Sequence, residues 1–359
     1  MRRKYLRFGL LMLAIGILET QAQSIHVSPK GSDKNPGSKE KPVASLTAAR
    51  TLVRNYKKTK GLPKGGLNVI IHGGIYDLHE TFQLTEEDAG PITWSAAAGE
   101  KVSITGGKTI QPGKFSKVTD KGIVDRLEKN AIGNVWQADL RAEGIKNFGN
   151  HRQYGHGLPV IPATLELFYN GEPMTLSRYP NKGAMKIGKV ADPGSVPRTG
   201  DKSNRGALFA YTDSRHKKWV GQNNIWIQGT LNYGFGDDYN PIDFIDTVAG
   251  QVKLKKPHLY GVGSGKDFQE YVAINILEEL DSPGEWYIDE TSGILYFWPP
   301  ADLKDALIQV SMLEDPIIAL EGTENVVLSG LTIEAGRGIG VYIERSNHTL
   351  VAGCTVRNV

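Results

Sequence analysis

Apolar residues along this chain recur mostly at every second position, in short runs that glycines separate. Such runs cover residues 67–72, 102–105 and 325–333. Alternation of this kind is typical of half-buried strands, and the intervening glycines indicate turns. The pattern predicts an all-β chain.

One segment has helical spacing instead. Leu46, Ala49 and Val53 fall on one face of a helix. Ser45 can cap its start, and Gly61 marks its end. We expect a helix between these two residues, with its apolar face covering the open end of a stack of strands.

A repeat near the end of the chain gives the strongest internal signal. Residues 325–333 return as residues 348–356, with Gly330 and Gly353 twenty-three residues apart. A period of about 20 to 30 residues is a signature of solenoids. Superposing the copies stacks Ile333 over Val356 inside, and Leu331 over the only cysteine, Cys354, which we expect to be a small core residue.

The region between the two sets of strands shows no such period. Residues 111–310 contain alternating, aromatic-rich strands that predict an inserted antiparallel module with a sandwich-like arrangement. The expected fold class is therefore a right-handed parallel β-helix, a solenoid. Residues 23–110 would form the helical cap and first coils, and residues 311–359 further coils, which we expect to be incomplete where this chain stops.

The first residues have the order of a secretory signal peptide. Four basic residues precede an apolar run at residues 8–18, and small residues follow near residue 22. We expect cleavage there and a periplasmic or secreted protein, since no cysteine is present for a lipid anchor and no later segment is long enough to insert in a membrane.

The net charge and the spacing of the histidines argue against two kinds of ligand, nucleic acids and metal ions. The predicted signal peptide carries the chain's whole net charge of +3, so the remainder is formally neutral and binding to nucleic acid is not expected. His151 and His156 match no firm metal-site spacing. We expect neither a metal ion nor another cofactor.

Six sequence blocks are spread over nearly the whole predicted mature chain. They are VSPKGSD at 27–33, GLPKGG at 61–66, GEKVSITGG at 99–107, SRYPN at 177–181, LDSPGEWY at 280–287 and LYFWPP at 295–300. Taken in this order, they resemble glycoside hydrolase family 141 of the Bacteroidetes. The resemblance implies hydrolysis of plant cell-wall glycans, either pectic rhamnogalacturonan side chains in an α-L-fucosidase-like reaction or xylan.

The catalytic residues stay unknown from the sequence. Hydrolysis of a glycosidic bond normally needs two carboxyl groups, and the resemblance implies that they lie on later coils, beyond Val359. Glu278, Glu279 and Asp281 are close together, but a strand would split their side chains between two faces. We do not expect them to form a catalytic pair.

One segment mixes carboxylates with aromatic rings in a way that suits sugar binding. The candidate substrate-binding residues are Trp226, Tyr233, Asp237, Asp238 and Tyr239. The alternative for the same residues is an acidic turn beside core aromatics. Two alternative functions also stay open, a polysaccharide lyase on the same fold and a glycan-binding protein without catalytic activity.

Overall fold

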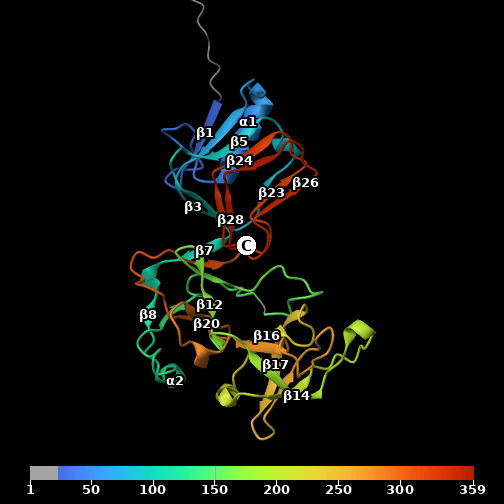
Figure 1. Cartoon of the computed structure of the whole chain (residues 1–359). Helices are drawn as coiled ribbons and strands as arrows, with labels where there is room; N and C mark the ends of the chain where they lie inside the picture. The colour runs from blue at the N-terminus through green and yellow to red at the C-terminus, as the bar shows by residue number, and fades with distance from the viewer. Residues whose placement is uncertain (1–22, 150) are drawn as a thin grey trace, which may run out of the picture.

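The computed structural model describes residues 23–149 and 151–359, so the signal peptide expected at residues 1–22 lies outside the described residues. The strands form six sheets, three of them parallel and three mostly antiparallel. Figure 1 shows the parallel sheets at one end of an elongated molecule and a barrel at the other, with the remaining sheets between them.

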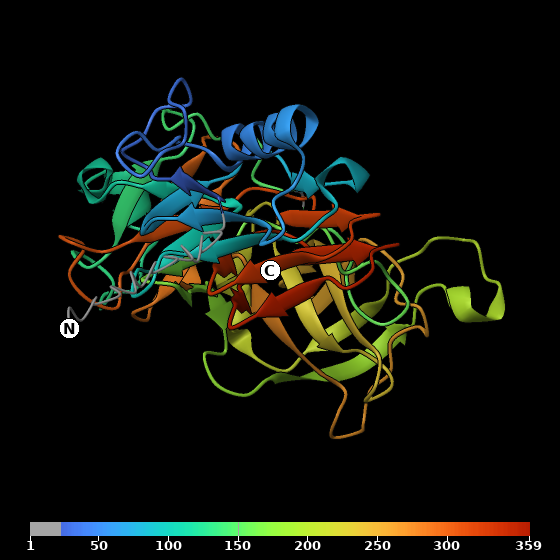
Figure 2. The same ribbon diagram turned by 90° about the horizontal axis from the view of Figure 1, so that it is seen from above.

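The parallel sheets combine strands from both ends of the chain. Strand β24 pairs with β5, β23 with β4 and β25 with β6, although the whole antiparallel part separates each pair in sequence. Figure 2 shows these early and late strands side by side. The sheets comprise β1 (Gln23–Val27), β2 (Leu67–Ile71), β5 (Ile92–Ala96), β24 (Val326–Ser329) and β27 (Leu350–Ala352); β3 (Gly74–Asp77), β6 (Val102–Thr105), β25 (Thr332–Glu334) and β28 (Thr355–Arg357); and β4 (Phe82–Leu84), β23 (Ile318–Glu321) and β26 (Val341–Glu344).

The predicted repeat register is confirmed. Ile333 pairs with Val356, and Glu334 pairs with Arg357 on the neighbouring strand. Ile333 is fully buried, and Cys354 packs against the same apolar cluster. The side chains of Glu334 and Arg357 form an ion pair at 2.8 Å, since equivalent positions of stacked parallel strands lie directly over one another.

The predicted helix is present as α1 (Leu46–Lys60). The Ser45 hydroxyl accepts a hydrogen bond from the Ala48 amide at 3.1 Å, as an N-cap residue does. Gly61 ends the helix with a φ of 72°, a conformation that glycine adopts without strain. Leu46, Ala49 and Val53 are buried in the apolar cluster of the parallel sheets.

Two sheets connect the parallel part to the barrel. They consist of β11 (Glu172–Pro173), β10 (Leu167–Tyr169), β22 (Ile308–Ser311) and β7 (Gly107–Ile110); and of β12 (Thr175–Leu176), β20 (Glu285–Asp289), β21 (Ile294–Phe297), β9 (Trp136–Asp139) and β8 (Ser116–Lys117). The short helix α2 (Lys121–Val124) follows β8. Trp286 and Phe297 belong to the apolar cluster that these sheets bury between them.

The barrel closes because β19 pairs with β14 on one side and with β16 on the other. Its interior holds Phe209, Tyr271 and Trp219. The strands are β13 (Arg178–Tyr179), β19 (Glu270–Ile274), β14 (Met185–Asp192), β15 (Leu208–Tyr211), β18 (Gln251–Leu254), β17 (Asp237–Asp246) and β16 (Trp226–Thr230), where β13 is an additional short strand beside β19.

Short 3₁₀ helices occur in the connections. They are η1 (Glu86–Asp88), η2 (Pro112–Lys114), η3 (Pro197–Thr199), η4 (Ser214–Trp219) and η5 (Leu277–Glu279). Among the described residues, every helix is too short or too polar to cross a membrane.

The expected fold class is wrong. The chain does not form a single right-handed parallel β-helix with an inserted module. It forms several sheets, among them a closed six-stranded antiparallel barrel. The error has a physical cause: alternating apolar residues with glycine between them are common to parallel and antiparallel strands. The repeat itself covers two copies, which is too little to establish one solenoid for the whole chain.

Candidate functional site

A cleft runs along the boundary between the barrel and the connecting sheets. It consists of two hollows of about 230 and 290 Å³ that share Tyr154, Thr164, Glu166 and Tyr239. We call it the seam cleft. Its other lining residues are His151, Gly155, Val160, Ala163, Leu165, Met174, Thr175, Leu176, Arg178, Gln228, Asp237, Ile274 and Trp286.

Glu166 is the carboxyl group that the local backbone directs into this cleft. Leu165 and Leu167, its neighbours, are both buried in the core. The Glu166 amide donates a hydrogen bond to the Ser311 hydroxyl, and the Glu166 carbonyl accepts one from the Ser311 amide. Strand alternation therefore places the Glu166 side chain on the opposite face, toward the cleft.

The Glu166 carboxylate has no hydrogen-bond or ion-pair partner among the described residues, although its side chain is only partly exposed. Burial raises the pKa of this carboxyl, and the charge of Arg337 offsets part of the rise. Removal from water disfavours the ionised form. Glu166 therefore keeps its proton to a higher pH than an exposed glutamate does.

Two tyrosines give the cleft aromatic walls. The rings of Tyr154 and Tyr239 meet edge to face, with their centroids 5.8 Å apart. The Tyr154 hydroxyl donates a hydrogen bond to the Pro162 carbonyl at 3.1 Å, which orients the ring. Burial raises the pKa of Tyr239, so its hydroxyl stays protonated and can donate a hydrogen bond to a ligand.

Polar side chains complete the lining. Gln228 has no side-chain partner among the described residues, so its amide is available to a ligand. Arg178 donates a hydrogen bond to the Pro180 carbonyl at 3.2 Å. His151 Nδ1 lies 3.1 Å from a carboxylate oxygen of Glu290 at one end of the cleft. The cleft thus offers uncharged donors and acceptors, one cation and aromatic surface.

The structure brings only some of the predicted site residues together. Asp237 and Tyr239 both line the seam cleft. Asp238, between them on β17, is directed the other way and is buried, with one oxygen 3.4 Å from Gln153 Nε2 and the other without a partner. Burial raises the pKa of Asp238 to about 7.

Trp226 and Tyr233 lie outside the cleft lining. Trp226 is buried in a small cluster against which Tyr239 packs, and its indole N–H donates a hydrogen bond to Asn224 at 2.8 Å. Tyr233 is exposed and stacks on Phe235, with ring centroids 5.6 Å apart. Trp226 thus supports the cleft, whereas Tyr233 belongs to a separate exposed aromatic cluster.

Sequence reasoning missed several lining residues, among them Glu166, Tyr154, Arg178 and Trp286. One signal for Glu166 was present, because it is a single charge between Leu165 and Leu167 in an apolar strand. A charge in that context needs a partner or a polar cleft. The other residues carry no such local signal.

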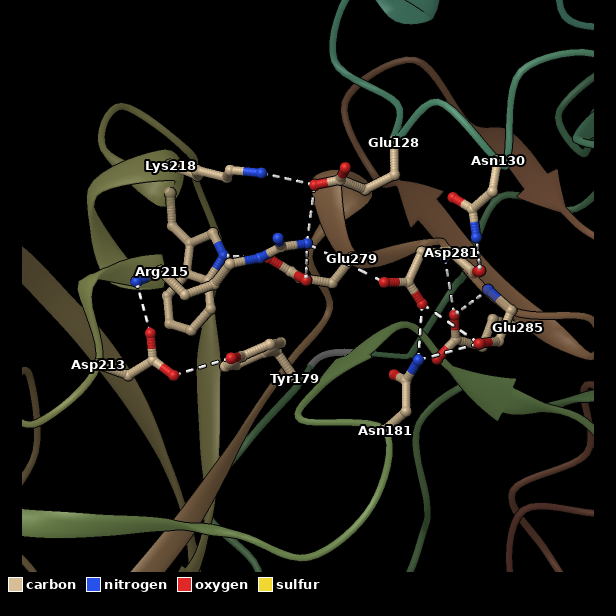
Figure 3. A network of polar contacts seen from close by, with 12 residues as sticks. Glu128, Asn130, Tyr179, Asn181, Asp213, Arg215, Lys218, Glu279, Asp281 and Glu285 are labelled. Atoms are coloured by element: carbon tan, nitrogen blue, oxygen red, sulfur yellow. Dashed lines mark hydrogen bonds and ion pairs between the residues drawn. The ribbon is translucent and has the colours of Figure 1, made fainter.

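The acidic residues Glu278 and Glu279 take part in ion pairs instead of facing the seam cleft. Two nitrogens of Arg215 each lie 2.7 Å from a Glu279 oxygen, and the Trp219 indole donates to the same carboxylate at 2.6 Å. Glu278 pairs with Arg126 at 2.7 Å. Figure 3 shows the Glu279 network, which joins the barrel to the connecting segment at Glu128. Residues 277–279 form a 3₁₀ turn instead of the expected strand.

The described residues contain no group of three or more His, Cys, Asp or Glu side chains placed to hold a metal ion. His151 interacts with Glu290, and His156 stacks on Tyr260 with ring centroids 6.0 Å apart.

Comparisons with known proteins give a structural likeness. No protein-family model matches the chain, and no curated protein sequence matches it. A Bacteroides protein described as a glycoside hydrolase superposes with a TM-score of 0.64 at 18% identity, covering 88% of this chain and 51% of its own. The chain shares its fold with that part of the Bacteroides protein. It spans about half the length of that protein.

A second solved structure, described as XylC in complex with xylose, matches less well. It has a TM-score of 0.37 at 15% identity and covers 88% of this chain and 36% of its own.

Proposed function

We propose that this chain is part of an exported glycoside hydrolase that holds plant cell-wall polysaccharide in the seam cleft. The fold likeness supports a carbohydrate-active protein. The composition of the cleft supports the same reading, because aromatic faces combined with a few convergent polar groups are typical of ligand sites. Export rests on the signal peptide predicted at residues 1–22.

One observation carries the proposal: the unpartnered, partly buried carboxyl of Glu166 in the cleft. In glycoside hydrolysis one carboxylic acid protonates the leaving oxygen, and a second carboxylate acts as nucleophile or activates water. A raised pKa suits the first role. We assign it to Glu166, and we assign the second role to Asp237, which lines the same cleft.

The substrate class follows from the family 141 resemblance together with the cleft. Pectic rhamnogalacturonan side chains, cut in an α-L-fucosidase-like reaction, and xylan are the proposed substrates. In either case the rings of Tyr154 and Tyr239 would pack against the apolar face of a sugar. Gln228 and Arg178 would bind its hydroxyls.

Replacing the proposed acid tests the assignment. In the full protein, Glu166→Gln keeps the shape of the side chain but removes the transferable proton. General acid catalysis contributes roughly 10²- to 10⁴-fold, so we expect kcat on pectic or xylan oligosaccharides to fall at least 100-fold. The matched control is Glu172→Gln, an exposed glutamate on the nearby strand β11, which should keep wild-type kcat.

A wild-type rate for Glu166→Gln would contradict the assignment and place the catalytic acids elsewhere, as the sequence resemblance implied. Release of an unsaturated uronate product would indicate a lyase instead.

The exposed aromatic cluster favours a second candidate, a glycan-binding protein without catalytic activity. Tyr233 and Phe235 stack on each other and remain accessible, and flat exposed rings suit sugar binding without chemistry. This candidate predicts that Tyr233→Ala weakens polysaccharide binding while Glu166→Gln leaves it unchanged, with no hydrolysis by either protein.

A further inference from the structure

A third hollow, of about 410 Å³, lies next to the seam cleft and has no assigned role. It is lined by Arg126, Gly221, Gln222, Asn223, Asn224, Asn275, Tyr287, Ile288, Asp289, Glu290 and Thr291. We call it the amide pocket, after its four amide side chains. His151 lines the seam cleft, and its partner Glu290 lines the amide pocket, so this pair forms the wall where the two hollows adjoin.

Strand β20 lies between the two hollows. Trp286 lines the seam cleft and the next residue, Tyr287, lines the amide pocket, because consecutive strand residues face opposite sides of a sheet. A ligand longer than the seam cleft would therefore reach the amide pocket around this strand, past the contact between His151 and Glu290.

The charged side chains of the amide pocket are engaged within the protein. Arg126 forms an ion pair with Glu278 at 2.7 Å. Asp289 accepts hydrogen bonds from the Thr291 amide at 2.9 Å and the Ser292 hydroxyl at 2.7 Å. Glu290 is paired with His151. These groups leave little unneutralised positive charge for an anionic ligand.

Some of the uncharged groups in the amide pocket have no partner, although Gln222 is bound to Arg126 and Glu278, and Asn224 to Trp226. Asn275 is 2% exposed, and its amide oxygen has no hydrogen-bond partner. A buried acceptor without a partner is costly, so it is expected to bind water or a ligand donor. The Asn223 amide and the Tyr287 hydroxyl likewise have no partner among the described residues.

We propose that the amide pocket binds a neutral sugar unit of a glycan whose other units occupy the seam cleft. This inference rests on the proposed function. Neutral donors and acceptors match sugar hydroxyls, whereas a uronate would place its charge beside Asp289 and Glu290. The substrate is thereby specified as a neutral oligosaccharide long enough to span both hollows.

Binding of sugars of different length tests this proposal. The full protein carrying Glu166→Gln, which prevents cleavage, is titrated calorimetrically with xylobiose, xylohexaose and hexagalacturonate. The double variant Asn223→Ala/Tyr287→Phe is then introduced. Tyr296→Phe is the matched control, because Tyr296 stacks on Tyr287 with ring centroids 6.2 Å apart but does not line the pocket.

We expect xylohexaose to bind more tightly than xylobiose and hexagalacturonate. The double variant should weaken xylohexaose about 10-fold, as expected for two lost neutral hydrogen bonds, while xylobiose and the Tyr296→Phe control stay unchanged.

Equal xylohexaose affinity in the double variant and the control would overturn the amide-pocket proposal and leave the proposed function standing. Failure of xylobiose and xylohexaose to bind at all would overturn the amide-pocket proposal together with the xylan part of the proposed function.

Discussion

Buried polar side chains have hydrogen-bond partners more consistently in the parallel sheets than in the antiparallel part of the molecule. In the parallel sheets Glu334 accepts hydrogen bonds from Ser103 at 2.5 Å and from Arg357 at 2.8 Å. Among the described residues of those sheets, Trp94 Nε1 is the one buried side-chain nitrogen or oxygen without a partner. The other such atoms belong to His151, Arg152, Tyr211, Asp238, Asn240, Asn275 and Glu278, all in the antiparallel part.

This difference indicates that the parallel sheets act as a scaffold and that the antiparallel part contains the candidate ligand sites. Stacked strands repeat the same environment, so apolar residues fill the interior and charged residues at equivalent positions, such as Glu334 and Arg357, pair with one another. The antiparallel part joins several sheets at irregular boundaries, where polar groups stay buried without partners. Such departures from regular packing are expected where a protein binds ligands, and both the seam cleft and the amide pocket lie there.

The largest expected effect concerns the ion pair that joins the barrel to its neighbours. Arg215→Ala leaves the fully buried Glu279 carboxylate without its bidentate partner. Losing one partner of a buried pair costs about 3 to 5 kcal/mol, so we expect a clear fall in the midpoint of urea unfolding. Lys218→Ala, which removes an exposed partner of Glu128, should cost less than about 1 kcal/mol. Similar midpoints for the two variants would contradict a structural role for the network.

A smaller, pH-dependent effect is expected at Asp238. Its folded-state pKa is raised to about 7 by burial, so folding favours the protonated form. The stability that this provides is complete below the ordinary aspartate pKa of about 4 and is lost as pH rises through about 7. Asp238→Asn should remove this loss and stabilise the protein relative to wild type by on the order of 2 kcal/mol at about pH 8.

Unfolding measured in urea between about pH 5 and pH 8 checks the Asp238 prediction. Asp243→Asn, at an exposed position of the same strand β17, is the control and should follow the wild type. A pH-independent difference between Asp238→Asn and wild type would show that Asp238 is not a buried titrating group.

The smallest effect is expected in the parallel sheets. Arg357 is 41% exposed, whereas its partner Glu334 is only 4% exposed and keeps a hydrogen bond from Ser103. Partial exposure weakens an ion pair, so Arg357→Ala should shift the unfolding midpoint less than Arg215→Ala does, but more than Arg345→Ala, whose side chain is 73% exposed. A loss as large as that of Arg215→Ala would erase the distinction between the two regions.

Local signals in the sequence predicted local structure well. Ser45 and Gly61 marked the ends of helix α1, and the repeat gave the pairing of Ile333 with Val356. The fold class could not be predicted in the same way, because period-two alternation does not distinguish a barrel strand from a parallel one. The domain boundaries at residues 110 and 310 stay predictions.

The candidate site was only partly accessible to sequence reasoning. Asp237 and Tyr239 were selected because carboxylates and aromatic rings cluster there, and they do line the cleft. Glu166 and Trp286 come from distant segments that meet only when β10, β12 and β20 assemble beside the barrel. Long-range strand pairing of this kind leaves no local pattern.

A crystal structure of the full Glu166→Gln protein with xylohexaose would test most directly whether the seam cleft is the glycan site. We predict sugar units between Tyr239 and Glu166, continuing past His151 into the amide pocket. Sugar bound only at the exposed rings of Tyr233 and Phe235, with the seam cleft free of sugar, would contradict the proposed site.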